Sequence, residues 1–243
     1  MKKIIIALLL LIGGMNTIAQ RLSDHNTIGW YSTTITPSFS KNLSGHLEYQ
    51  WRRDHVVTDW QQSLLRVGLN YKVHPQLTLH LGYGWIETYA YGDFPLARVA
   101  KQFPEHRLYE QMVVTAPIGK ANLLHRFRLE QRWLGRLNNM NSTRADEYIY
   151  LNRARYMPRL DLPIGSKWFA SVYDEIFIGF GKNVGENVFD QNRIGLMAGY
   201  KASPNFRIEG GFINQVVQLG REVNGQNVFQ YNNGIIINTY VNF

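Results

Sequence analysis

The stretch Gly234-Ile-Ile-Ile-Asn-Thr-Tyr-Val-Asn-Phe243 decides the fold class of this chain of 243 residues. Counting back in twos from Phe243 places Val241, Thr239, Ile237 and Ile235 on one face. A period of two is the signature of a β-strand. A final strand that ends on an aromatic residue is typical of proteins inserted into a bacterial outer membrane, because the assembly machinery recognises that strand. We therefore expect the strand ending at Phe243 to bind the barrel assembly machinery.

The same alternation recurs along the chain in segments of about ten residues or more. One such segment places Leu79, Leu81 and Tyr83 on one face and His80 and Gly82 on the other. A soluble sandwich also alternates, with its apolar face inward. Two features favour a membrane barrel: aromatic residues lie toward the ends of the apolar faces, as in an interfacial girdle, and the segments exceed the usual five or six residues of soluble strands. The fold class predicted is all-β, a single antiparallel up-and-down transmembrane β-barrel of residues 20–243.

The connections between these segments alternate between short and long, which is the asymmetry expected of periplasmic turns and external loops. We expect long connections at residues 55–59, 92–105, 135–145, 179–186 and 221–226, and an unusually long one on the short-turn side at 158–165. Eleven strands are recognisable from Ile28 onward, whereas bacterial single-chain barrels have an even number. Three explanations stay open: a missed strand, a lumenal path for residues 20–27, or a first segment that does not complete the wall. The sequence therefore predicts 10 to 12 strands.

The first 19 residues have the pattern of a secretory signal peptide. Lys2 and Lys3 precede the apolar run 4–12, and the small residues Thr17 and Ala19 precede Gln20, so we expect cleavage after Ala19. The alternative, a membrane anchor, needs about 20 apolar residues. Without Lys2 and Lys3 the chain has 24 basic and 18 acidic residues, a net charge of +6. Its basic residues are spread singly, so we expect outer-membrane lipid and lipopolysaccharide as partners and no nucleic acid.

Five short motifs of this chain resemble a known family. They are Glu48-Tyr-Gln-Trp-Arg52, Glu105-His-Arg-Leu-Tyr-Glu-Gln111, His125-Arg-Phe-Arg-Leu-Glu-Gln-Arg-Trp133, Asp174-Glu-Ile-Phe177 and Asp190-Gln-Asn-Arg193. As a set they are similar to the outer-membrane β-barrel proteins grouped as domain of unknown function 2490. The resemblance covers essentially the whole chain after the signal peptide. It implies the barrel architecture and an outer-membrane location, and it implies no particular chemistry.

The strongest polar constellation consists of charged residues at alternate positions of neighbouring predicted strands. A lipid-facing charge at mid-depth costs about 2–4 kcal/mol, so these side chains are expected to face the lumen. They are Arg66, Arg126, Arg128, Glu130, Arg132, Arg153, Arg155, Glu175, Arg193 and Glu209. In a narrow barrel such ladders fill and brace the interior. Alternatively, guanidinium groups could form an anion-selective constriction or hold a phosphate or carboxylate ligand.

Catalytic and metal-binding signals are weak. His46 and His80 fall on inward faces, but no spacing typical of a metal site accompanies them. His106 and His125 are candidates for a general base without a nucleophile motif beside them. Adjacent strand residues point to opposite faces, so Asp174 and Glu175 are not expected to share one site. We therefore expect no catalytic residues, no metal and no cofactor, and a largely plugged, porin-like barrel that is structural or binds a small anionic ligand. The alternatives are a narrow anion-preferring channel and, third, a hydrolase acting on lipid or peptide.

Overall fold

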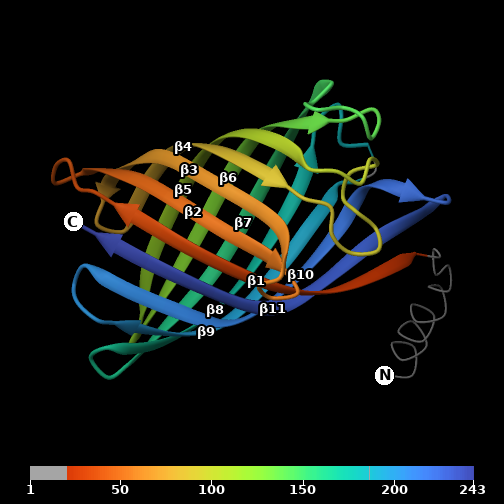
Figure 1. Ribbon diagram of the computed structural model, residues 1–243. Coiled ribbons are helices and arrows are strands. Elements are labelled where there is room, and N and C mark those ends of the chain that lie inside the picture. Colours follow the sequence, from red (N-terminus) through yellow and green to blue (C-terminus); the bar gives the residue numbers. More distant parts are fainter. Residues whose placement is uncertain (1–20, 186) are drawn as a thin grey trace, which may run out of the picture.

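Eleven strands close into one barrel in this computed structural model, which describes residues 21–185 and 187–243 (Figure 1). The strands are β1 (Leu22–Thr36), β2 (Leu43–Asp54), β3 (Asp59–His74), β4 (Leu77–Thr88), β5 (Phe103–Ile118), β6 (Ala121–Arg136), β7 (Glu147–Ile164), β8 (Trp168–Phe180), β9 (Phe189–Lys201), β10 (Phe206–Val223) and β11 (Gln226–Asn242). The expected signal peptide lies outside the described residues. No helix in the described part of the chain is long and apolar enough to cross a membrane.

The barrel closes where β1 meets β11, and this is the only parallel pairing among the described strands. Ile28 lies beside Gly234, whose missing Cβ lets the two backbones approach, because an added Cβ would collide with the backbone of Ile28. An odd number of strands follows directly, since β1 starts at the end of the barrel opposite to the C-terminus (Figure 1). The fold class is confirmed, but the expectation of antiparallel pairing throughout is wrong at this seam. Residues 22–27 belong to the wall and do not thread the lumen.

The two faces of the strands differ as the sequence predicts. Leu129 is 49% exposed on the outer surface, while the adjacent Glu130 is 1% exposed in the interior. Leu81 and Leu196 are likewise 59% and 61% exposed on the outer wall. A soluble protein would bury such residues, whereas a membrane barrel presents them to lipid.

Several predicted connections are wrong because the strands are longer than the sequence suggests. Glu105 lies in β5, and β7 continues to Ile164, so residues 158–164 belong to a strand and only a short turn follows. Pro158 is tolerated in β7 because Met157 and Pro158 do not take part in the pairing of β7 with β8. No backbone N–H is therefore needed at Pro158 on that side. The expected long connection at 221–226 is a tight turn at Asn224 and Gly225, both with positive φ.

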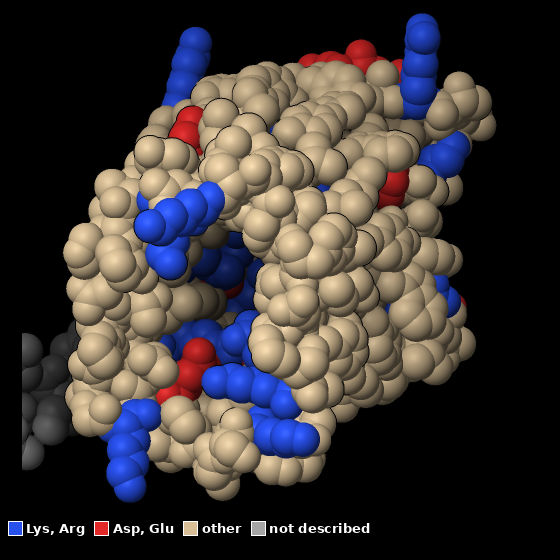
Figure 2. Space-filling view, turned by 90° about the vertical axis from the view of Figure 1, so that its left-hand side faces the viewer, with Lys and Arg blue, Asp and Glu red and all other residues tan. Residues whose placement is uncertain are grey.

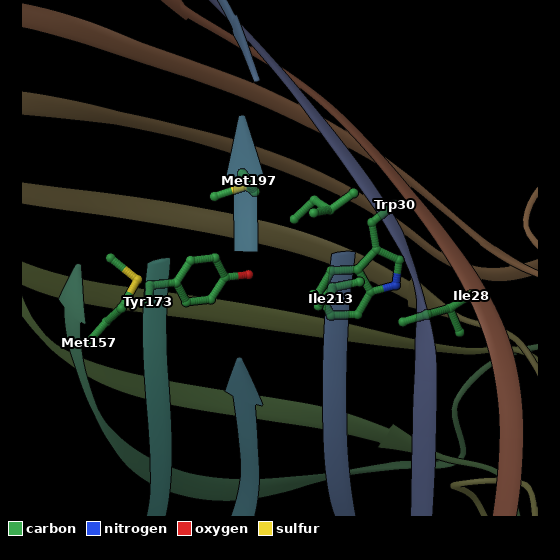
Figure 3. Close-up of a cluster of buried hydrophobic side chains, with 7 residues drawn as sticks. Ile28, Trp30, Met157, Tyr173, Met197 and Ile213 are labelled. Atoms are coloured by element: carbon green, nitrogen blue, oxygen red, sulfur yellow. The ribbon is translucent and has the colours of Figure 1, made fainter. Parts of the chain in front are cut away.

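Part of the lumen is filled by apolar side chains, which the sequence does not predict. Trp30, Tyr173 and Met197 belong to a buried cluster that projects inward from β1 and β7–β11 (Figure 3). The remaining members are Ile28, Met157, Ile213 and Ile236. This cluster narrows the interior, and it lines one cavity together with charged residues such as Arg155 and Glu175.

Candidate functional site

A network of arginines and carboxylates occupies the middle of the lumen. Its centre is Glu130 of β6, whose carboxylate accepts hydrogen bonds from Arg107 of β5 and from Arg153 and Arg155 of β7. The donor–acceptor distances are 3.3, 2.8 and 2.6 Å. These residues meet because they occupy inward positions of adjacent strands in register, Glu130 lying directly opposite Arg153. A buried charge is costly unless it is paired, so the burial of this carboxylate and of its arginines requires such ion pairs.

Two further carboxylates extend the network along the barrel. Glu175 accepts from Arg126 and Arg155, both at 2.7 Å. Toward the loop end, Glu105 accepts from Arg132 at 2.8 Å and also binds Arg107. Each carboxylate therefore bridges strands, which braces the wall from inside.

All ten residues of the predicted ladder face the lumen. Seven of them form one connected group: Arg126, Arg128, Glu130, Arg132, Arg153, Arg155 and Glu175. Arg66 pairs with Glu48 instead, and Glu209 pairs with Arg159, at 3.0 and 2.6 Å. Arg193 forms no ion pair within the described residues, although it lines the same cavities.

Two cavities lie within the lumen, with volumes of about 170 and 230 Å³. The smaller is lined by Tyr91 and Phe103 near the long loops, and the larger by Tyr240 and Glu175 toward the short turns. Figure 2 looks into the end where the C-terminus lies and shows a hollow lined by Lys or Arg and by Asp or Glu side chains. Four arginines line both cavities and therefore form the junction between them. They are Arg52, Arg66, Arg155 and Arg193.

Positive charge exceeds negative charge in these cavities. Ten arginines line them: Arg52, Arg66, Arg107, Arg126, Arg128, Arg132, Arg153, Arg155, Arg159 and Arg193. Four lining carboxylates oppose them: Glu48, Glu105, Glu175 and Asp190. Glu130, Asp161 and Glu209, which bind lining arginines, raise the count to seven, so ten minus seven leaves three guanidinium charges uncompensated.

Two arginines of the junction have no carboxylate partner within the described part of the chain. Arg52 donates to the amide oxygens of Gln50 and Gln62, and Arg193 donates to Gln191. Both guanidinium groups also lie over the ring of Trp30, 3.7 and 4.7 Å from its centroid. Amide and aromatic partners orient a guanidinium without neutralising it.

The N–H edges of the junction are only partly used. The Nε atoms of Arg66 and Arg193 are buried and have no hydrogen-bond partner in the described structure. Guanidinium N–H pairs match the oxygens of carboxylate and phosphate. The junction therefore has the charge and the free donors to bind a small oxyanion.

The segment of residues 89–102, between β4 and β5, closes the loop end of the lumen. Tyr91 donates to Gln230 of β11 at 2.9 Å, and Gln230 donates to the carbonyl of Phe94 at 2.9 Å. Asp24 of β1 accepts from the backbone N–H of Phe94. Burial raises the pKa of Tyr91 to about 12, so its hydroxyl stays protonated and can donate. This segment thus crosses from one side of the barrel to the other.

The four histidines considered from the sequence are divided between the lumen and the outer face. His46 and His80 face the lumen and stack edge to face, with centroids 4.9 Å apart. His106 and His125 contact the hydroxyls of Tyr83 and Tyr156 on the outer face and so do not reach the lumen. No group of three or more His, Cys, Asp or Glu side chains in the described ranges is arranged to hold a metal ion.

Sequence reasoning missed several lumenal residues. Glu105 and Arg107 were hidden because the preceding loop-like stretch obscured the start of β5. Arg52 lies on the face that the alternation in β2 predicts to be inward, and its neighbours gave no sign that it lacks an acidic partner. The lack of an acidic partner beside Arg52 depends on the pairing register across the barrel, and the sequence does not show that register.

Comparisons with known proteins give one family and two structures. A family model described as "Protein of unknown function (DUF2490)" matches residues 27–226. No curated protein matches the chain. A structure titled "NanC porin structure in rhombohedral crystal form" is similar with a TM-score of 0.47 and 12% identity, over 88% of this chain and 97% of that one. A refined porin structure is similar with a TM-score of 0.36 and 13% identity, over 84% and 60% of the two chains.

Proposed function

This chain belongs to the family described as protein of unknown function (DUF2490), and from its lumen we propose that it is a largely plugged outer-membrane barrel that binds a small oxyanion. The observation that carries the proposal is the junction of Arg52, Arg66, Arg155 and Arg193. Two of these four arginines have no carboxylate partner in the described structure. Most other lumenal charges are paired and serve to brace the wall.

The size of the cavities limits the ligand. Pockets for drug-sized molecules usually measure about 300–1,000 Å³, whereas these cavities measure about 170 and 230 Å³. An anion of the size of phosphate or a short carboxylate fits such a space. We place its binding site at the edges of Arg52 and Arg193, reached from the short-turn end, because the segment 89–102 closes the other end.

A narrow anion-preferring channel is the second candidate. It is favoured by one observation, namely that a cavity lies on each side of the junction. In such a channel, an anion bound at the junction would be in transit from one cavity to the other and would not stay bound there. The two candidates share the binding step and differ in whether the loop end opens.

Titration of the purified barrel with inorganic phosphate, followed by calorimetry, tests the binding step. The double variant Arg52→Gln, Arg193→Gln should weaken phosphate binding at least about tenfold, because each charge-assisted hydrogen bond contributes about 1.5–3 kcal/mol. Arg136→Gln is the matched control, since Arg136 is half exposed and pairs with Glu147 at the loop end. Absence of phosphate binding by the unchanged protein, or equal affinity in the double variant, would refute the proposal.

A further inference from the structure

A row of polar side chains crosses the outer wall of β8–β11, where a membrane barrel is expected to be apolar. Asp174 of β8 lies beside Ile194 of β9, Ile194 beside Asn214 of β10, and Asn214 beside Asn233 of β11. Asn192 of β9 donates a hydrogen bond to Asp174, and Asn214 donates to Asn233 at 2.7 Å. We call the four polar residues Asp174, Asn192, Asn214 and Asn233 the outer polar row, and Ile194 lies at its centre.

Asp174 lies at the middle of the apolar belt. The outward residues of β8 begin at Trp168 and end at Phe180, and Asp174 is six positions from each. Twelve residues of a strand tilted by 35–45° rise roughly 28–33 Å, which is about the thickness of the hydrocarbon core. The apolar outward neighbours Val172 and Ile176 flank it and are 44% and 39% exposed. A carboxylate is therefore placed near the bilayer midplane.

Lipid cannot satisfy the hydrogen-bonding groups of this row. Each amide has more donors and acceptors than its one bond within the row uses, and hydrocarbon offers no partner for the remainder. Ionisable residues at this depth are expected to face protein or water and not lipid. The row therefore indicates a surface that is covered by protein in the membrane.

We propose that the outer wall of β8–β10 is the interface between two copies of this chain. Asparagine amides donate and accept, so a surface that carries them is complementary to itself about a twofold axis along the membrane normal. Such an axis through Ile194 brings Asp174 of one copy toward the amide of Asn214 of the other. A different membrane protein would need an independently matched row, whereas a second copy supplies one by symmetry.

The backbone next to the row also permits close approach. Ala170, Ala198 and Gly210 lie side by side on β8, β9 and β10, two residues nearer to the short turns than Val172, Leu196 and Phe212. Small residues are enriched where membrane-spanning elements pack together. They allow the larger side chains of the facing wall to enter the interface.

Glu110 on β5 also faces outward, and it accepts a hydrogen bond from Gln131. It is a single pair, and the surrounding outer groove is lined mainly by large apolar residues such as Leu81 and Leu129. Gln131 lies beside the outward amide of Asn152 on β7, and Asn152 lies beside Phe180, where the belt of β8 ends. These amides are therefore at the edge of the belt, whereas Asp174 and its partners are at its middle. We therefore assign the contact to β8–β10.

Cysteine cross-linking in membranes tests the interface, because the chain has no cysteine of its own. Ile194→Cys places a thiol at the centre of the row, and Leu129→Cys is the matched control on the far wall; the two native side chains are 45% and 49% exposed. A short bis-maleimide should convert most of the Ile194→Cys protein to twice the monomer mass and leave Leu129→Cys monomeric. Equal yields for the two variants, or a product with another protein only, would overturn the proposal.

A double variant distinguishes loss of the contact between two copies from loss of folding. In the Ile194→Cys background, Asn192→Leu with Asn214→Leu should lower the cross-linked fraction at least about fivefold, while the different migration of boiled and unboiled samples shows that the barrel is intact. If cross-linking persists in this folded variant, the amides do not form the contact. The readout does not depend on anion binding, so it stands or fails separately from the proposed function.

Discussion

At the scale of the residue, Glu130 shows how one buried carboxylate organises several strands. Its side chain has no measurable exposure, and it pairs with Arg107, Arg153 and Arg155. Each of these guanidinium groups is itself buried, so loss of the carboxylate leaves positive charges close together in a poorly hydrated space. The loss of stability on substitution of Glu130 is therefore set by the guanidinium groups that remain unpaired and not by the hydrogen bonds that are lost.

We expect Glu130→Gln to destabilise the barrel by about 3–5 kcal/mol, the usual cost of removing one partner of a buried ion pair. Glu147→Gln should cost about 0–1 kcal/mol, because Glu147 is half exposed and pairs with Arg136 at the surface. Comparison of the temperatures at which the two variants lose the migration of the folded form measures the difference. Equal temperatures would show that water reaches Glu130 and screens its partners.

At the scale of the element, the segment of residues 89–102 converts an open barrel end into a closed one. Its attachment to β1 and β11 consists of polar contacts, chiefly those of Tyr91, Gln230 and Asp24. Gly92 in this segment has a positive φ and lies against the side chain of Asp24, so a larger residue would be both strained and crowded. Such an attachment depends on a few hydrogen bonds more than on a large apolar contact.

Tyr91→Phe should loosen this segment, since it leaves the buried amides of Gln230 and Asn232 without the hydroxyl that they share. An unsatisfied buried group costs about 1–3 kcal/mol. Faster proteolysis within residues 92–101 and a higher frequency of brief current openings in bilayers are the expected results. Tyr89→Phe is the control, because Tyr89 stacks on Trp60 and contributes no lumenal hydrogen bond in the described structure. If both variants behave alike, the hydroxyl of Tyr91 does not hold the segment.

The elements show what the sequence can and cannot predict. Strands with apolar residues at every second position, such as β6 and β8, are recognisable, and so are their inward charges. The start of β1 is not, because Ser23 and His25 on its outer face and Asp24 between them are all polar, which removes the alternation. Closure by a parallel β1–β11 seam depends on pairing between residues more than 200 positions apart. The absence of carboxylates beside Arg52 and Arg193 is a property of the same long-range register.

At the scale of the whole molecule, an apolar exterior surrounds an interior that is filled by two sets of side chains. One is the buried apolar cluster around Trp30, and the other is the arginine–carboxylate network, which lines a cavity together with it. Two small cavities lie in the described lumen and meet at the arginine junction. Because the guanidinium charges exceed the carboxylates around these cavities by three, the interior should repel cations and attract anions.

Purified protein in planar bilayers should therefore show little steady conductance, and any small current should favour anions. A salt gradient gives the sign of the reversal potential and hence the preferred ion. Arg52→Gln with Arg193→Gln lowers the excess from three charges to one, so the reversal potential should move toward zero while Arg136→Gln leaves it unchanged. Large, stable and weakly selective currents from the unchanged protein would contradict the plugged lumen.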